Sequence, residues 1–265
     1  MVDERADWRD LGPRHYRKQK IVDMEWEAID LSIYKVAGAK FGGPVALMRD
    51  TSKPLKVGQV ALPNDKIFVY TSGGNKIADF APEGHLVGMG WTDTEQLVCV
   101  QMDGNVFVYD IHGEYSFQFS TGRTVREQGV KECSIWGTGL VILTQQHKLF
   151  WVTNFTERKT VEMPDPSMDE PPTCMTVIEP ALTETQTPEV LLGSPDGAIL
   201  VVTTEGCSDQ EISVSKGPYK QMVCSADGKY LACFSAAVRH NVLPQQHCRV
   251  VPKVALNNAL CHRDQ

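Results

Sequence analysis

The chain has 265 residues, 42% of them hydrophobic, which is enough for a large core and too much for a disordered chain. Its length permits one or two domains. Its formal net charge of −7 argues against nucleic acid as the main partner, since phosphate binding needs a basic face. No stretch approaches the ~18 consecutive apolar residues that span a bilayer, so any membrane association is expected to be peripheral and indirect.

The N-terminal segment is polar. Residues 1–10 are acidic and lack the apolar stretch of a secretory signal, so the chain is predicted to be cytoplasmic. Residues 14–20 (RHYRKQK) form a basic patch that suits anionic lipid headgroups, although an exposed segment without that role is the simpler interpretation. The best helical candidate, residues 25–31, is short.

The first strand-like runs are short and rich in β-branched and aromatic residues. They cover residues 43–50, 66–74 and 75–80 and form an incomplete set. Two glycine-rich stretches lie among them, residues 37–44 and 71–76. Neither has the spacing of a phosphate-binding loop or leads into a convincing helix, so both are interpreted as turns.

A repeat organises the middle of the chain. The run HLVGMGW ends at Trp91 and the similar run VKECSIW ends at Trp136, and further similar runs begin at Thr173 and Tyr219. These intervals match the ~40–45 residues of a four-stranded propeller blade. Within each period the same order recurs, namely four runs of apolar residues separated by Gly, Asp, Asn or Pro.

Two Asp-Gly pairs, Asp103-Gly104 and Asp196-Gly197, stand at equivalent places in successive periods. Glycine takes the positive φ of a tight hairpin turn without steric cost, so both pairs predict the same hairpin. Parallel strands would need crossovers of a dozen or more residues, for which there is no room. The sequence therefore predicts an all-β, WD-like β-propeller built from antiparallel meanders.

Two loops interrupt the repeat. Residues 163–172 are acidic and proline-rich, and residues 181–189 are polar. Loops tolerate insertion, so both are interpreted as surface excursions of a blade, with partner binding as the sharper alternative.

The pattern stops after residue 235. We predict a partial propeller of about four to five blades over residues 1–235, and a divergent or disordered tail over residues 236–265 that an alternative transcript or a shifted reading frame would explain. A propeller that does not close leaves blade faces exposed. We therefore expect lower stability than in a closed ring, and association between chains.

No residues suggest catalysis, a cofactor or a metal site. The eight cysteines have no zinc-binding spacing and are interpreted as buried, reduced thiols. The seven histidines form no paired motif, and Ser194 lies in a turn sequence rather than a nucleophile elbow. An acceptor sequence for glycosylation at Asn154 is interpreted as chance. A propeller enzyme with a site in the central channel is the weaker alternative, because the inner runs are mostly apolar or small.

Several segments together resemble the N-terminal half of the vacuolar protein sorting-associated protein 16 family. The resemblance covers most of residues 7–235, and its most specific parts are residues 7–26, 41–50, 67–78 and 88–115. It implies an N-terminal β-propeller that a long α-solenoid follows. That solenoid is missing here, and the resemblance provides no individual binding residue.

The resemblance implies a non-catalytic subunit of the class C tethering complexes, HOPS and CORVET. These act in vesicle-mediated transport on the cytosolic face of endosomes and of lysosomes or vacuoles, through Rab GTPases and SNAREs. The expected partners are the other class C subunits. The contact with a Sec/Munc-type subunit belongs to the solenoid and is not transferred to this chain. A generic propeller adaptor outside vesicle tethering is the alternative.

Overall fold

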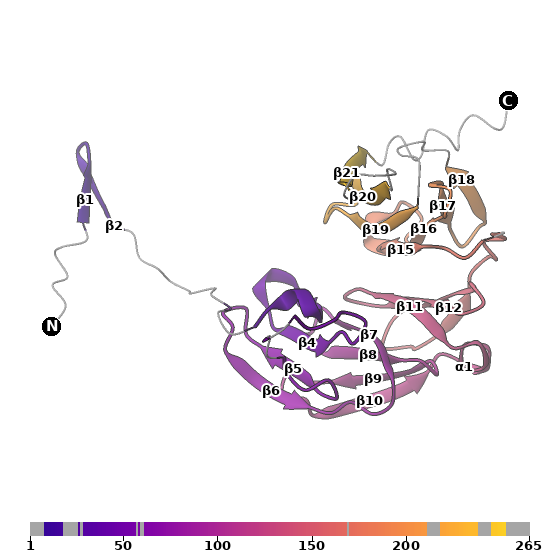
Figure 1. Cartoon of the computed structure of the whole chain (residues 1–265), viewed down its shortest axis with the longest axis horizontal. Helices are drawn as coiled ribbons and strands as arrows, with labels where there is room; N and C mark the ends of the chain where they lie inside the picture. Colours follow the sequence, from indigo (N-terminus) through magenta and orange to yellow (C-terminus); the bar gives the residue numbers. More distant parts are fainter. Residues whose placement is uncertain are drawn as a thin grey trace.

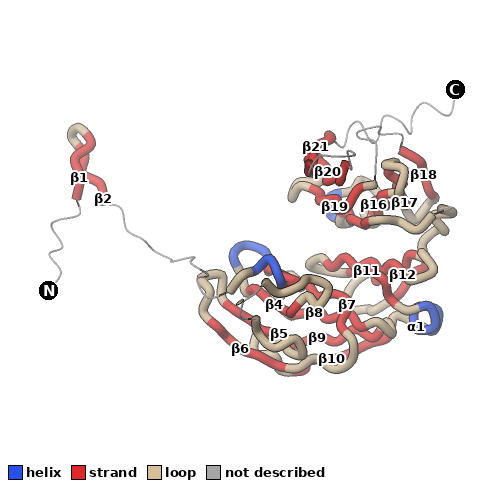
Figure 2. Tube along the Cα trace, viewed as in Figure 1, coloured by secondary structure: helices blue, strands red, loops and turns tan. Residues whose placement is uncertain are grey.

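The computed structural model describes residues 8–17, 26, 29–56, 58, 61–168, 170–210, 218–237 and 245–252. Strands dominate these residues, and they form consecutive antiparallel sheets (Figures 1 and 2). Four sheets have four strands each and one has three, and in every sheet the strands pair in chain order. This arrangement confirms the predicted all-β, WD-like propeller built from meanders.

The first two sheets come from the N-terminal half of the chain. Sheet one contains β3 (Tyr34–Gly38), β4 (Val45–Arg49), β5 (Ile67–Tyr70) and β6 (Lys76–Phe80). Sheet two contains β7 (Leu86–Trp91), β8 (Leu97–Gln101), β9 (Asn105–Tyr109) and β10 (Tyr115–Ser120). The sequence analysis missed β3, and its addition makes sheet one a complete four-stranded blade.

The third and fourth sheets follow the same order. Sheet three contains β11 (Val130–Ile135), β12 (Leu140–Thr144), β13 (Leu149–Val152) and β14 (Thr160–Glu162). Sheet four contains β15 (Cys174–Ile178), β16 (Glu189–Gly193), β17 (Ile199–Val202) and β18 (Cys207–Gln210). The sequence run after β18, residues 211–217, lies outside the described residues.

The fifth sheet extends into the segment that was predicted to be a tail. It contains β19 (Tyr219–Cys224), β20 (Tyr230–Ala237) and β21 (Gln245–Pro252), and β20 pairs with β21 along its whole length. The predicted boundary at residue 235 therefore falls inside β20. Strand pairing uses backbone groups, so it does not require the blade-like sequence pattern that is missing here. The division of the chain into two regions stays a prediction.

Two short elements lie outside this repeat. A hairpin of β1 (Trp8–Leu11) and β2 (Arg14–Arg17) precedes the sheets and lies apart from them in Figure 1. One α-helix, α1 (Arg123–Gln128), links sheets two and three. The sequence analysis missed α1, because only Val125 of its six residues is buried and so short a helix shows no periodicity. Of the helix expected over residues 25–31, Leu31 begins the 3-10 helix η1 (Leu31–Ile33).

The hairpin turns have a common construction. Gly104 and Gly197 have φ of 77° and 92°, which confirms the two predicted Asp-Gly turns. Many turns begin with a hydroxyl side chain that accepts a hydrogen bond from a backbone N–H four residues later. The distances are 3.0 Å for Thr92 and Gln96, and 2.9 Å for Ser194 and Ala198. Such local bonds satisfy backbone groups that the ladder leaves open.

Apolar cores join each sheet to the next. Alternate residues of a strand point to opposite faces, so each sheet contributes to the core on either side of it. Separate clusters of buried side chains connect sheets one and two, two and three, three and four, and four and five. Trp91 also donates from Nε1 to the carbonyl of Ala37 at 2.9 Å, which ties sheet two to sheet one. The sheets therefore stack in chain order.

The stack curves. Lys40, between β3 and β4, donates from Nζ to Glu179 Oε2 at 3.2 Å, and Glu179 follows the inner strand of sheet four. Sheets one and four meet at these loops, although two sheets separate them in the chain. No buried cluster among the described residues joins sheet five to sheet one, so the structure is an incomplete propeller.

Candidate protein-binding surfaces

The residues that the sequence analysis considered for catalysis or ligand binding lie in turns or at the ends of strands. His85, His112 and His147 stand at strand ends or in turns. Ser194 hydrogen bonds to Asp196 within the hairpin that the sequence predicted. Both glycine-rich stretches join strands of sheet one, as their interpretation as turns required. Within the described ranges, no three His, Cys, Asp or Glu side chains gather as a metal site would require.

The cysteines that the structure describes are mostly packing residues. Cys99, Cys133 and Cys174 lie in or against the cores between sheets, where burial raises the pKa of the Cys133 thiol to about 12. A thiol in such a place stays protonated and unreactive. Cys207 is exposed on β18, and its thiol lies 3.3 Å from the Asp165 carbonyl. The prediction of buried thiols is therefore confirmed for Cys99, Cys174 and Cys233 and is wrong for Cys207.

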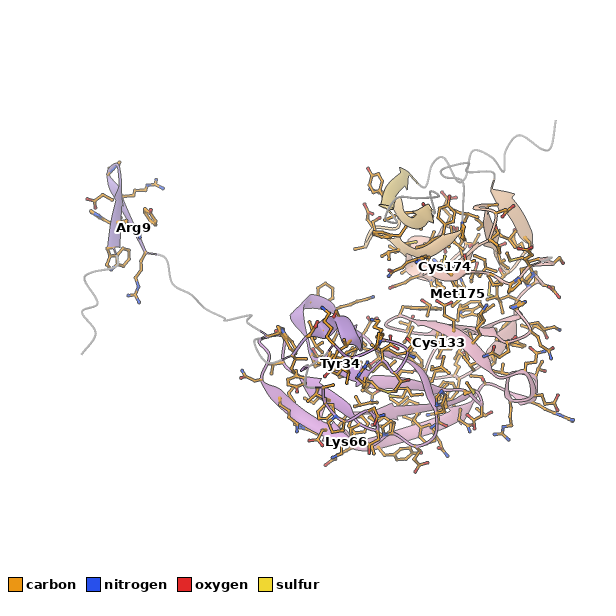
Figure 3. The ribbon with its side chains drawn as sticks, viewed as in Figure 1. Arg9, Tyr34, Lys66, Cys133, Cys174 and Met175 are labelled. Carbon is orange, nitrogen blue, oxygen red and sulfur yellow. The ribbon has the colours of Figure 1, made fainter. Side chains whose placement is uncertain are left out.

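A carboxyl group lies at the inner strand of sheet three. Glu132 on β11 is half-buried, and desolvation raises the pKa of its side chain. Its neighbour Lys131 donates from Nζ to the carbonyl of Pro172 at 3.0 Å, at the start of sheet four. In Figure 3, Cys133 of β11 lies opposite Cys174 and Met175 of β15. These polar contacts link two sheets and form no cluster of catalytic groups.

The proline-rich loop, residues 163–172, is more than a surface excursion. Met163 is buried and Met168 packs against the core between sheets three and four. The Met163 N–H donates to the Leu149 carbonyl at 2.9 Å. The loop thus closes the junction between two blades, and its described residues that are exposed are Asp165, Ser167, Glu170 and Pro171.

The two outermost sheets, one and five, differ in whether their outer faces are covered. The free face of sheet one carries Tyr34, Leu47 and Phe68, which are buried because Trp26 and η1 cover them. The Trp26 and Tyr70 rings meet edge to face at 5.3 Å. The predicted exposure of blade faces is therefore wrong for sheet one.

Sheet five has an uncovered face. Strand alternation places Val223, Tyr230 and Phe234 on the face opposite the core with sheet four. Their side chains are 46%, 49% and 36% exposed. These three residues, called the open face here, form an apolar patch of the kind that marks an association surface.

A shallow cleft lies beside α1. It has a volume of about 500 Å³, and its lining includes Gln101, Met102, Arg126 and Gln128. The Gln128 Oε1 atom is buried and accepts no hydrogen bond from any described residue. The cleft lies where the ends of sheets two and three meet the helix.

Among the described residues, Phe41 has the most exposed large hydrophobic side chain. It lies in the 3-10 helix η2 (Lys40–Gly42) between β3 and β4. Next to it, the Lys40 ammonium group is 3.2 Å from Glu179 Oε2 and 3.6 Å from Asp93 Oδ1. The sequence analysis interpreted this glycine-rich stretch as a turn and did not single out Phe41, because an isolated phenylalanine in a sequence gives no sign of its exposure.

These consecutive antiparallel sheets define a protein of the WD-like β-propeller class. The β-propeller domain of Cps50 (Swd1) from Myceliophteria thermophila has a similar structure, with a TM-score of 0.51 over 84% of this chain and 73% of that chain. The two are only 12% identical, so the likeness concerns the fold alone.

The family model described as Vps16, N-terminal region, matches residues 4–246, and the chain belongs to this family. Protein VACUOLELESS1 of Arabidopsis thaliana is 33% identical over 98% of this chain and 33% of its own length. The vacuolar protein sorting-associated protein 16 homolog of Dictyostelium discoideum is 32% identical over 86% of this chain and 28% of its own length. The predicted resemblance is confirmed, and the chain spans about a third or less of these relatives.

Proposed function

We propose that this chain is a non-catalytic, protein-binding subunit of the class C vacuolar sorting complexes HOPS and CORVET. The observation that carries the proposal is the family match over residues 4–246, with relatives named for vacuolar protein sorting. The fold supports it, since propellers present loops and blade faces to other proteins. The subunit contributes a fixed surface and no chemistry of its own.

The proposed place of action is the cytosolic face of endosomes and of lysosomes or vacuoles. In the described part of the chain, no helix has the length and apolar character needed to cross a bilayer. The proposed attachment is peripheral and passes through the other subunits. The contact with a Sec/Munc-type subunit is left out of the proposal, because the resemblance assigns it to a solenoid that these residues do not form.

Co-purification tests the proposal. Affinity-tagged chain is expressed in cells of its own source, and the captured proteins are probed for the other class C subunits. The expected result is capture of at least one of them, and a longer relative serves as the positive control. Capture by the longer relative and none by this chain would contradict the proposal. Capture of unrelated partners alone would favour the alternative, a generic propeller adaptor.

A further inference from the structure

Phe41 stands out in its loop because its ring is exposed. Its side chain is 104% exposed relative to a reference phenylalanine, and the neighbouring Lys40 side chain, which is half-exposed, pairs with acidic side chains. An aromatic ring left in water buries no apolar surface and so adds nothing to the stability of the loop. The exposed ring therefore requires an explanation.

The backbone of Phe41 has an uncommon conformation. Its φ of 57° and ψ of 31° lie in the left-handed region, where a bulky side chain is an outlier. Glycine or asparagine takes this conformation more readily. Strained residues of this kind persist where the surrounding structure fixes them, and they cluster at functional sites.

The surrounding loop is firmly held. The Ala39 N–H donates to the Pro44 carbonyl at 2.8 Å and the Gly43 N–H to the Lys40 carbonyl at 3.2 Å. Lys40 pairs with Asp93 of sheet two and with Glu179 beside sheet four. Sheets one, two and four thus fix the loop before any partner arrives, which lowers the entropy lost on binding.

The surroundings of the ring are acidic. The Glu95 carboxylate approaches within 3.0 Å of the position that a Cβ on Gly43 would occupy, and Asp93 and Glu179 lie beside Lys40. Two carboxylates thus pair with the Lys40 ammonium group and a third lies beside Gly43, which leaves the loop net negative. An anionic membrane surface would repel it, while a basic protein surface would attract it.

We propose that Phe41 is an anchor residue, which inserts into an apolar pocket with a basic rim on another subunit of the sorting complex. The inference rests on the proposed function and adds a contact point to it. Aromatic side chains held rigidly before binding are typical of the few residues that dominate an interface. The acidic rim sets the orientation of the partner, and the ring provides the contact.

Three variants test this role by co-purification with co-expressed class C subunits. Phe41→Asn removes the ring but suits the left-handed backbone, so we expect at least tenfold less captured subunit with an unchanged or higher Tm. Phe41→Tyr keeps the ring and should retain capture. Tyr115→Asn, at a side chain that is 58% exposed on β10, is the matched control and should also retain it.

Each other outcome overturns a different statement. Capture by Phe41→Asn at the wild-type level overturns the anchor while leaving the proposed function intact. A fall in Tm that parallels the loss of capture would show a structural role instead. Phe41-dependent binding to phosphatidylserine vesicles would replace the protein partner by a membrane. If the wild-type chain captures no subunit, the proposed function and the anchor both fail.

Discussion

At the scale of single residues, the pKa of Asp79 shows how one charged side chain contributes to the stability of the fold. Asp79 on β6 accepts hydrogen bonds from Lys66 and then from Lys76, and these bonds lower the pKa of its carboxyl group to about 2. Because this pKa is lower in the folded chain than the ~3.9 of the unfolded chain, the ionised Asp79 stabilises the folded state at pH values above ~3.9. This stabilisation is lost as the pH falls toward 2.

Asp79→Asn should therefore lower the Tm at pH 7, and its difference from the wild type should shrink as the pH approaches 2. Asp65→Asn is the control, because it removes an exposed carboxylate near Lys66 without breaking a hydrogen bond that holds β6. Thermal unfolding followed by circular dichroism at several pH values measures both. A difference between Asp79→Asn and wild type that does not change with pH would contradict this assignment.

The pKa shift of Glu132 has the opposite direction to that of Asp79. Desolvation raises the pKa of this half-buried carboxyl group, so the unfolded chain gives up the proton more readily than the folded one. The protonated form stabilises the folded state at low pH, and that stabilisation is lost as the pH rises through the raised pKa. Glu132→Gln should consequently raise the Tm at pH 7 and change it little at pH 4. A lower Tm at pH 7 would show that the carboxylate is stabilising there.

At the scale of elements, close packing of inner strands fixes the spacing between sheets. A Cβ on Gly88 of β7 would lie 2.4 Å from the Cys133 Sγ of β11, and one on Gly90 would lie 2.7 Å from Ile135 Cβ. Neither glycine has a positive φ, so the requirement is for space and not for conformation. Sheets two and three can approach this closely only because these side chains are absent.

Gly88→Ala should lower the free energy of unfolding by about 1–3 kcal/mol through this overlap. Gly38→Ala on β3 is the control, because its Cβ would meet nothing within 4 Å, and it should be nearly neutral. The Sγ atom is the whole obstacle at Gly88, so the double variant Gly88→Ala with Cys133→Ala should recover most of the loss. Urea unfolding of the wild type, Gly88→Ala, Cys133→Ala and the double variant measures the coupling between the two positions, and additive effects would refute it.

Strands and turns were predictable from the sequence where neighbouring residues alone determine them. Asp103-Gly104 predicts its hairpin because glycine alone sets the turn, and the strands of sheets two and three carry enough apolar residues to stand out. α1 and β3 were missed because one is too short for periodicity and the other mixes lysine and glycine into its run. β21 was missed because backbone pairing leaves no apolar pattern to read.

The surfaces were less predictable than the strands. In the sequence Phe41 resembles any core phenylalanine, and the Lys40–Glu179 contact beside it joins residues that are 139 positions apart in the chain. The covering of sheet one by Trp26 is likewise a long-range contact with Tyr70. Spacing along the chain reports local structure, whereas such surfaces arise only once the sheets are stacked.

For the whole molecule, the difference between the outer faces of sheet one and sheet five determines which surface is available for association between chains. Trp26 and η1 cover the free face of sheet one, but the described residues of sheet five leave Val223, Tyr230 and Phe234 uncovered. Burying one such side chain between two chains contributes about 1.5–3 kcal/mol. We therefore expect the open face to drive association that depends on protein concentration.

Val223→Lys and Phe234→Lys should each weaken that association by about tenfold or more, because each places a charge where the contact would exclude water. Leu55→Lys, at a loop side chain with 49% exposure, is the matched control and should leave association unchanged. Sedimentation velocity over a range of concentrations measures the effect against the 29.4 kDa of a single chain. Equal association of all four proteins would mean that another surface joins the chains.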